Sequence, residues 1–223
     1  MIEAILLDVD NTLLDFNACA RESMISACQA LDVSWSEAMF SVFLRVNDAL
    51  WREIEAGRLT VEELYRRRWS SIFRELGIPG DGEAFERCFL SYLEESACPV
   101  EGALELVAYL SEKYTLCVAS NAPYEQQCGR LARAGLLPWF QHLFISERIG
   151  AAKPSKAFFD ACLAELALER EEVMIIGDSL TADIQGGADY GLKTCWFCPD
   201  GLEPKLVPAD HRVSTLTEIK SFL

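Results

Sequence analysis

Two carboxylic acids and a hydroxyl group follow the first apolar segment of the chain at a regular spacing. Asp8, Asp10 and Thr12 are each separated by one residue. In an extended chain, side chains two residues apart point the same way, so both carboxylates should face one site. Two acids held that close ionise together only when a cation lies between them or when one keeps its proton. The spacing therefore indicates acid/base chemistry or a metal site, against the alternative of a solvated turn.

Polar side chains also end three later apolar or turn-forming segments. Ser120 and Asn121 close one segment, where backbone N–H groups at the start of the next helix would make a cradle for an anion. Lys153 lies in a turn, and Asp178 ends another apolar segment, with Asp183 following it. Each has a structural alternative, because Ser120 and Asp178 suit helix caps and most lysines are solvated.

Together these residues favour a hard cation. Three or four carboxylates, one ammonium group and two hydroxyls would gather at one edge, and oxygen ligands shared with phosphate are typical of Mg²⁺. His142 and His211 are the only histidines, so no cluster of histidines and cysteines offers a zinc site. The sequence also lacks a P-loop, a dinucleotide-binding fingerprint and a G-x-S-x-G motif.

A parallel sheet is the arrangement that would bring these residues to one edge. After residue 99, strand-like apolar segments alternate with helix-like segments of about 10 to 15 residues, which is typical of βαβ units. The expected strands are 2–7, 115–119, 142–145, 173–176 and 194–197, and the expected helices are 103–113, 124–134, 156–166, 182–190 and one from 216. We therefore expect an α/β fold with a doubly wound, Rossmann-like parallel sheet.

The segment 15–98 has a different sequence pattern. Helical periodicity covers 18–31, 35–56, 61–76 and 83–93, and no convincing strand interrupts it. We expect an α/β catalytic core formed by 1–14 and 99–223, with 15–98 inserted after the first strand as an all-helical cap. Because ligands of open α/β sheets bind at the carboxyl ends of the strands, the cap should act as a lid.

Two residue sets in this segment have competing interpretations. Its aromatic side chains would stack on a nucleobase or, as we favour at this helical spacing, fill the core of the bundle: Phe16, Phe40, Phe43, Trp51 and Trp69. The basic triplet at 66–68 is expected on a solvated helix face, and the alternative is that one of the three arginines reaches a ligand.

Charge and hydropathy exclude several classes of partner. The 223 residues include 20 basic and 35 acidic side chains, a net charge of −15, which repels nucleic acid polymers and anionic membranes. No apolar run reaches the ~20 residues that a membrane span requires. The first residues lack the basic start of a signal peptide. We expect a cytoplasmic monomer or homodimer that binds a small phosphorylated substrate and no membrane.

The four polar segments resemble, in order, spacing and context, the motifs of the haloacid dehalogenase-like (HAD) hydrolase superfamily. The resemblance covers nearly the whole chain and rests on Asp8-x-Asp10-x-Thr12, Ser120, Lys153 and Gly177-Asp178-x4-Asp183. The helical insertion resembles the type 1 cap of that superfamily. The sequence around the first and last motifs is similar to the pyrimidine 5'-nucleotidase branch.

This resemblance implies a Mg²⁺-dependent phosphatase that works through an aspartyl-phosphate. Asp8 would be the nucleophile, and Asp10 would serve as general acid and then general base. The residues implied to bind phosphate are Asn11, Thr12, Ser120, Asn121 and Lys153. The implied metal ligands are the side chains of Asp8 and Asp178 and the backbone carbonyl of Asp10, with Asp183 supporting them from nearby or through water.

The resemblance leaves the substrate open. The expected substrate is a nucleoside 5'-monophosphate. The alternatives are a sugar-phosphate phosphatase of the N-acylneuraminate 9-phosphatase or phosphoglycolate phosphatase type, a phosphomutase, and a regulatory protein that binds a ligand without turnover. Asp10 argues against dehalogenation, because the haloacid dehalogenases of the superfamily lack this second acid.

Overall fold

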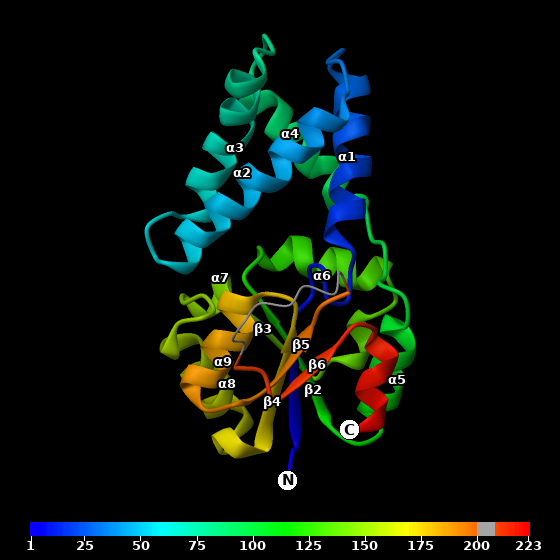
Figure 1. The fold of residues 1–223 in the computed structure, drawn as a ribbon, viewed down its shortest axis with the longest axis vertical. Coiled ribbons are helices and arrows are strands. Elements are labelled where there is room, and N and C mark those ends of the chain that lie inside the picture. The colour runs from blue at the N-terminus through cyan, green and yellow to red at the C-terminus, as the bar shows by residue number, and fades with distance from the viewer. Residues whose placement is uncertain (200–207) are drawn as a thin grey trace. The chain divides into compact units, whose positions relative to one another are not determined.

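The chain divides into two compact units. The computed structural model describes residues 1–199 and 208–223 (Figure 1). Residues Met1–Phe16 and Ala97–Leu223 form an α/β unit, and residues Asn17–Ser96 form a helical unit. Among the helices described, none combines the length and the apolar character needed to cross a membrane.

Parallel strands build the sheet of the α/β unit, which runs in the order β3-β2-β1-β4-β5-β6. The bounds are β1 Ala4–Leu7, β2 Thr115–Ser120, β3 His142–Ile145, β4 Val173–Gly177, β5 Lys193–Phe197 and β6 His211–Val213. The central strand β1 pairs with β2 and β4, so that Leu7 is in register with Val118 and Ile176. The direction of strand succession reverses at β1, and this switch point is where open α/β sheets bind ligands.

Helices cover both faces of the sheet, as in the expected doubly wound fold. Ile5 and Leu7 pack against α5 (Ala103–Ser111) and α6 (Tyr124–Arg133), whereas Ala4 and Leu6 pack against α8 (Lys156–Leu166) and α9 (Gly186–Tyr190). Figure 1 shows α8 and α9 on one side of the strands and α5 on the other. Burial on both faces explains why these strands are continuous apolar segments in the sequence.

Several short elements differ from the expected pattern. The helix expected over 182–190 consists of a π-helical turn, η3 (Leu180–Gln185), followed by α9. Strand β6 was not expected, because its three residues show neither an apolar run nor alternation. The remaining short elements are α7 (Ser146–Ile149) and the 3₁₀ turns η1 (Leu137–Trp139), η2 (Arg170–Glu172) and η4 (Leu216–Ser221).

The helical unit contains α1 (Phe16–Ala30), α2 (Glu37–Glu55), α3 (Val61–Leu76) and α4 (Gly82–Glu95). Its core is aromatic: the ring of Trp69 lies 5.6 Å from that of Phe43, 4.2 Å from Phe85 and 5.5 Å from Phe89, measured between centroids. Phe43 and Trp69 are fully buried. These two aromatic side chains therefore belong to the bundle core.

The basic triplet does not lie entirely on a solvated face. Arg66 and Arg67 are exposed and pair with glutamates one turn earlier. Arg68 is buried, donates to Asn47 Oδ1 at 2.8 Å and forms an ion pair with Glu86. The expectation of a solvated Arg68 is wrong because α3 turns this position toward the neighbouring helices.

Candidate active site

One buried lysine connects the carboxyl ends of three strands. Lys153 Nζ donates to Asp8 Oδ1 at 2.8 Å, to Asp183 Oδ1 at 2.6 Å and to the backbone oxygen of Ala119. All three donors of the ammonium group are thereby used. Asp8 itself continues the pairing of β1 with β4, since its N–H donates to the oxygen of Ile176 at 2.9 Å. The sheet and the lysine together fix the Asp8 carboxylate.

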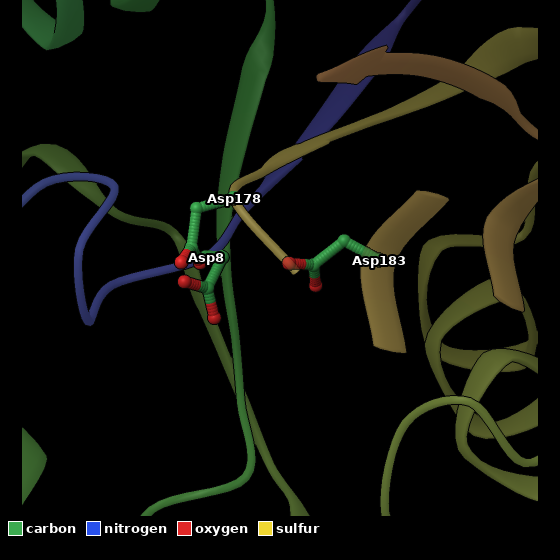
Figure 2. Close-up of side chains that lie close together, drawn as sticks. All are labelled: Asp8, Asp178 and Asp183. Atoms are coloured by element: carbon green, nitrogen blue, oxygen red, sulfur yellow. The ribbon is translucent and has the colours of Figure 1, made fainter. Parts of the chain in front are cut away.

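Asp178 completes an acidic cluster at this edge. One carboxylate oxygen from each of Asp8, Asp178 and Asp183 lies within 4.8 Å of the others. Figure 2 shows the carboxylates of Asp8 and Asp178 close together, with Asp183 approaching from the following turn. Three converging carboxylates are an oxygen-ligand set of the kind that holds a divalent cation.

Burial and mutual repulsion perturb the pKa values of this cluster. Burial raises the pKa of Asp8 to about 7 against the opposing effect of Lys153, and the charge of Asp183 adds to the rise. The pKa of Asp178 is raised well above its usual range by burial and then by the charges of Asp8 and Asp183. Burial alone would lower the pKa of Lys153, but the carboxylates of Asp183 and Asp8 raise it. The site therefore holds more negative charge than its lysine balances.

A tight loop follows Asp8. The backbone oxygen of Val9 accepts hydrogen bonds from the N–H groups of Thr12, Leu13 and Leu14. Asn11 has a φ of 61°, a left-handed conformation that asparagine tolerates better than most residues. Its N–H donates to the oxygen of Leu14 at 2.7 Å. Asn11 is one of the expected phosphate-binding residues, and its backbone amide is thus used within the loop.

The hydroxyl group of Thr12 is an unsatisfied polar group in this loop. Thr12 is fully buried, and its Oγ1 has no hydrogen-bond partner among the residues that the structure describes. Leaving a buried polar group unsatisfied costs about 1–3 kcal/mol, so such atoms are rare and call for an explanation. A ligand oxygen at this position would satisfy it.

The carboxylate of Asp10 is bound by side chains of α6 and is not part of the acidic cluster. Its Oδ2 accepts a hydrogen bond from Gln127 Nε2 at 2.7 Å, and its Oδ1 forms an ion pair with Arg130. Both partners are fully buried, whereas Asp10 is partly exposed. The two acids after β1 therefore occupy different environments, and only Asp8 joins the acidic cluster.

Ser120 and Asn121, at the end of β2, serve different purposes. Ser120 is buried, and its Oγ accepts hydrogen bonds from Ala122 N at 3.2 Å and Gln127 Nε2 at 2.9 Å. The side-chain amide of Asn121 pairs with the backbone of Lys153, donating to its oxygen at 2.9 Å and accepting from its N–H at 2.8 Å. The Asn121 side chain thus fixes the backbone of Lys153. The backbone amide of Asn121 is the group that is left to bind a phosphate.

The turn after β4 positions the other two acids. Asp183 lies in η3, and its Oδ2 accepts a hydrogen bond from Ser179 N at 3.1 Å. A Cβ atom on Gly177 would lie 2.1 Å from the same oxygen, so only glycine fits beside Asp183. Asp178 is held through its backbone oxygen, which accepts from Trp196 Nε1 at 2.9 Å.

Three of these residues were not found from the sequence. Gln127 and Arg130 lie three residues apart on the buried face of α6, where apolar side chains are expected, and a polar pair at such positions is the signal that was available. Trp196 lies in an apolar strand, where nothing in the sequence distinguishes it from a core residue.

Comparison with known proteins agrees with this geometry. Residues 2–191 match the haloacid dehalogenase-like hydrolase family. The chain is 35% identical to the pyrimidine 5'-nucleotidase PynA of Streptococcus pneumoniae over 89% of this chain and 85% of the relative. It is 30% identical to the pyrimidine 5'-nucleotidase YjjG of Escherichia coli, over 98% of this chain and 96% of the relative.

Solved structures show the same fold. A crystal structure of the Bacillus subtilis protein YfnB bound to magnesium matches with a TM-score of 0.94 at 32% identity, covering 100% of this chain and 98% of that one. A dehalogenase structure matches with a TM-score of 0.81 over 100% of this chain and 97% of that one, and at 19% identity this likeness concerns the fold alone. By sequence and by fold, the chain belongs to the haloacid dehalogenase-like hydrolases and is an enzyme of that family.

Proposed function

We propose that this hydrolase is a Mg²⁺-dependent phosphatase that cleaves a small phosphomonoester, a nucleoside 5'-monophosphate, through an aspartyl-phosphate. The observation that carries the proposal is the separation of the two acids after β1. Asp8 lies in the acidic cluster beside Lys153, whereas Asp10 faces Gln127 and Arg130. A nucleophile and a proton carrier need such distinct environments.

The charge of the site fits a divalent cation. Once all three carboxylates are ionised, they and the ammonium group of Lys153 would leave two net negative charges, which one divalent cation would balance. Asp8, Asp178 and Asp183 would hold Mg²⁺ together with the backbone carbonyl of Asp10. When bound, the cation supplies charge neutralisation for the oxygens of the transferring phosphoryl group.

The residues of the chain would divide the reaction into two transfers. A carboxylate oxygen of Asp8 attacks phosphorus, and the bond between phosphorus and the ester oxygen breaks while Asp10 gives that oxygen a proton. In the second transfer, Asp10 takes a proton from water, whose oxygen attacks the same phosphorus and releases inorganic phosphate from Asp8. The hydroxyl groups of Thr12 and Ser120 would bind the phosphoryl oxygens. Lys153 was also expected to bind phosphate, but its three donors are used by Asp8, Asp183 and Ala119, so its positive charge would act on the phosphoryl group from beside Asp8.

The choice of substrate rests on the relatives. PynA and YjjG are named as pyrimidine 5'-nucleotidases, and this chain covers most of the length of both. We propose the same substrate class here. We also propose that residues 15–98 act as the lid over the bound substrate, on the grounds that this segment is inserted directly after the loop that carries the catalytic acids.

The test is phosphate release by the purified protein from p-nitrophenyl phosphate, UMP, dTMP and a set of sugar phosphates. Release should require Mg²⁺ and stop with EDTA, and Asp8→Asn should be inert. Asp189→Asn, which alters an exposed aspartate, is the matched control and should keep full activity. Phosphate release that persists in EDTA would overturn the metal-dependent mechanism. If UMP and dTMP are no better than sugar phosphates, the nucleotidase assignment fails while the phosphatase assignment stands.

A further inference from the structure

The buried face of α6 carries a polar pair that the proposed mechanism does not use. The buried residues of this helix are Gln127, Arg130 and Leu131, and of these only Leu131 belongs to the apolar core. Burying a charged group costs several kcal/mol unless it is paired. A helix that only had to pack against the sheet would carry apolar side chains at all three positions.

The partners of Gln127 determine which way its amide group points. Arg130 has only donors, and its Nη1 donates to Gln127 Oε1 at 3.3 Å. The amide nitrogen therefore faces the acceptors on the other side, Asp10 Oδ2 at 2.7 Å and Ser120 Oγ at 2.9 Å. Arg130 also pairs with Asp10 Oδ1, so both oxygens of that carboxylate are bound by α6.

The same contacts determine the role of the Ser120 hydroxyl. A serine hydroxyl has two acceptor lone pairs and one donor proton. Both lone pairs are used, by Gln127 Nε2 and by Ala122 N, and within the part of the chain that the structure describes the proton has no acceptor. The Ser120 hydroxyl is thereby left as a donor at the edge where a phosphoryl oxygen would bind.

We propose that Gln127, oriented by Arg130, is a positioning residue that aligns the acid/base Asp10 and the donor Ser120 on the same phosphoryl group. This inference rests on the proposed phosphatase function. One amide nitrogen contacts both side chains, so it sets the distance between the group that handles the leaving-group proton and the group that binds a phosphoryl oxygen. A displacement of about 1 Å in such a group can cost on the order of 10²-fold in rate.

The leaving group provides the test. The alkoxide of a nucleotide needs a proton from Asp10 as it departs, whereas nitrophenolate is a stable anion that departs without one. The value of kcat/KM covers only the steps up to the transfer of the phosphoryl group to Asp8. Gln127→Met, which keeps the length of the side chain but removes the amide, should lower kcat/KM for UMP about 10²-fold and for p-nitrophenyl phosphate by no more than about tenfold. The alignment of Ser120 serves both esters, whereas the alignment of Asp10 serves only the ester that needs a proton.

Further variants separate positioning from folding. Gln126→Met makes the same change at the adjacent position, which is only half-buried, and should leave both values unchanged. Arg130→Lys keeps a cation beside Asp10 and should change the ratio of the two kcat/KM values in the same direction but by less, which keeps the test valid if Gln127→Met does not fold. Asp10→Asn should shift the ratio as Gln127→Met does, and the double variant should shift it no further.

The possible outcomes separate a failure of this inference from a failure of the proposed phosphatase function. If the wild-type protein releases no phosphate from any ester, both fail. If the wild-type protein is active but Gln127→Met and Arg130→Lys lose both substrates equally, or neither, Gln127 is structural and the inference alone fails. An additive effect of Asp10→Asn and Gln127→Met on the ratio would also overturn it, since residues that act through one another are not additive.

Discussion

The hydroxyl group of Thr12 is left unsatisfied by the residues that the structure describes, which lowers stability, and it is available to bind a ligand. Thr12 is fully buried with its Oγ1 unsatisfied in the described part of the chain. The hydroxyl group of the equally buried Thr194 accepts a hydrogen bond from Asp210 N, and its one proton has two acceptors within reach, the oxygen of Pro208 and Asp210 Oδ2. The two threonines have the same chemistry and the same burial. They differ in whether the protein itself supplies partners, which points to a ligand at Thr12 alone.

The two threonines therefore give opposite predictions for the change to valine. Thr12→Val removes an unsatisfied polar group and should leave the free energy of unfolding unchanged or raise it by up to about 1 kcal/mol. It should lower kcat/KM for the phosphate ester about tenfold, because one hydrogen bond to the phosphoryl group is lost. Urea unfolding and steady-state kinetics measure the two quantities.

Thr194→Val is the matched control. It leaves its partners unsatisfied, so it should lower the free energy of unfolding by about 1–3 kcal/mol and leave kcat/KM nearly unchanged. If Thr12→Val is destabilising and fully active, the hydroxyl group has a partner within the protein and no role in binding the substrate.

At this scale, sequence reasoning can place a side chain where its position along a strand determines its neighbours. Asp8, Ser120 and Asp178 follow the ends of apolar segments, and in a parallel sheet those ends meet at one edge. It does not find Gln127, because the partner of that side chain, Asp10, lies 117 residues away in the sequence. Only the packing of α6 beside the first loop makes the contact visible.

At the scale of elements, α3 carries a charged residue, Arg68, on its buried face. Arg68 lies one turn from both Leu64 and Ile72, which are fully buried, and it forms a buried ion pair with Glu86 on α4. Arg66 pairs with an exposed glutamate on its own helix. Breaking a buried ion pair leaves one charge uncompensated, whereas exposed pairs contribute little.

We expect Arg68→Met to lower the free energy of unfolding by about 3–5 kcal/mol, since Glu86 then stays buried without its partner. The double variant Arg68→Met, Glu86→Leu should recover most of that loss. Arg66→Met, a change of the same type on the exposed face, should alter stability by less than about 0.5 kcal/mol. Chemical denaturation followed by circular dichroism tests all three. If Arg68→Met is as stable as the wild type, Arg68 contributes nothing to stability through this ion pair.

The elements themselves were predictable to different degrees. Strands β1 to β5 were expected within one or two residues because burial on both faces makes them continuous apolar segments. Strand β6 consists of His-Arg-Val and depends on pairing with β5, so no local signal marks it. Residues 182–185 were expected to begin an ordinary helix, whereas the structure has a π-helical turn at Leu180–Gln185. This turn places Asp183 against Gly177 and the N–H of Ser179, contacts that have no local signal in the sequence.

At the scale of the whole molecule, charge links the site to the stability of the protein. The chain has a net charge of −15, and the acidic cluster brings three of its carboxylates together. The pKa of Asp8 is raised from 3.8 to about 7, first by burial. Between roughly pH 4 and pH 7, the folded protein without a cation therefore keeps a proton on Asp8 that the unfolded chain has already released. Its stability should accordingly fall as the pH rises through that window.

A divalent cation should reverse this loss, and the reversal should grow with pH. Protons and Mg²⁺ compete for the same carboxylates, so Mg²⁺ should raise the melting temperature more at pH 8, where Asp8 has lost its proton, than at pH 6. At a Mg²⁺ concentration about 100 times Kd, the stabilisation is about 2.7 kcal/mol, or roughly 5 to 10 °C for a chain of this size. Melting curves in MgCl₂ and in EDTA, at matched ionic strength, measure the difference at each pH. Asp178→Asn should abolish it, whereas the exposed Asp189→Asn should retain it. A Mg²⁺ effect equal at both pH values would show that the cation binds elsewhere than at these buried acids.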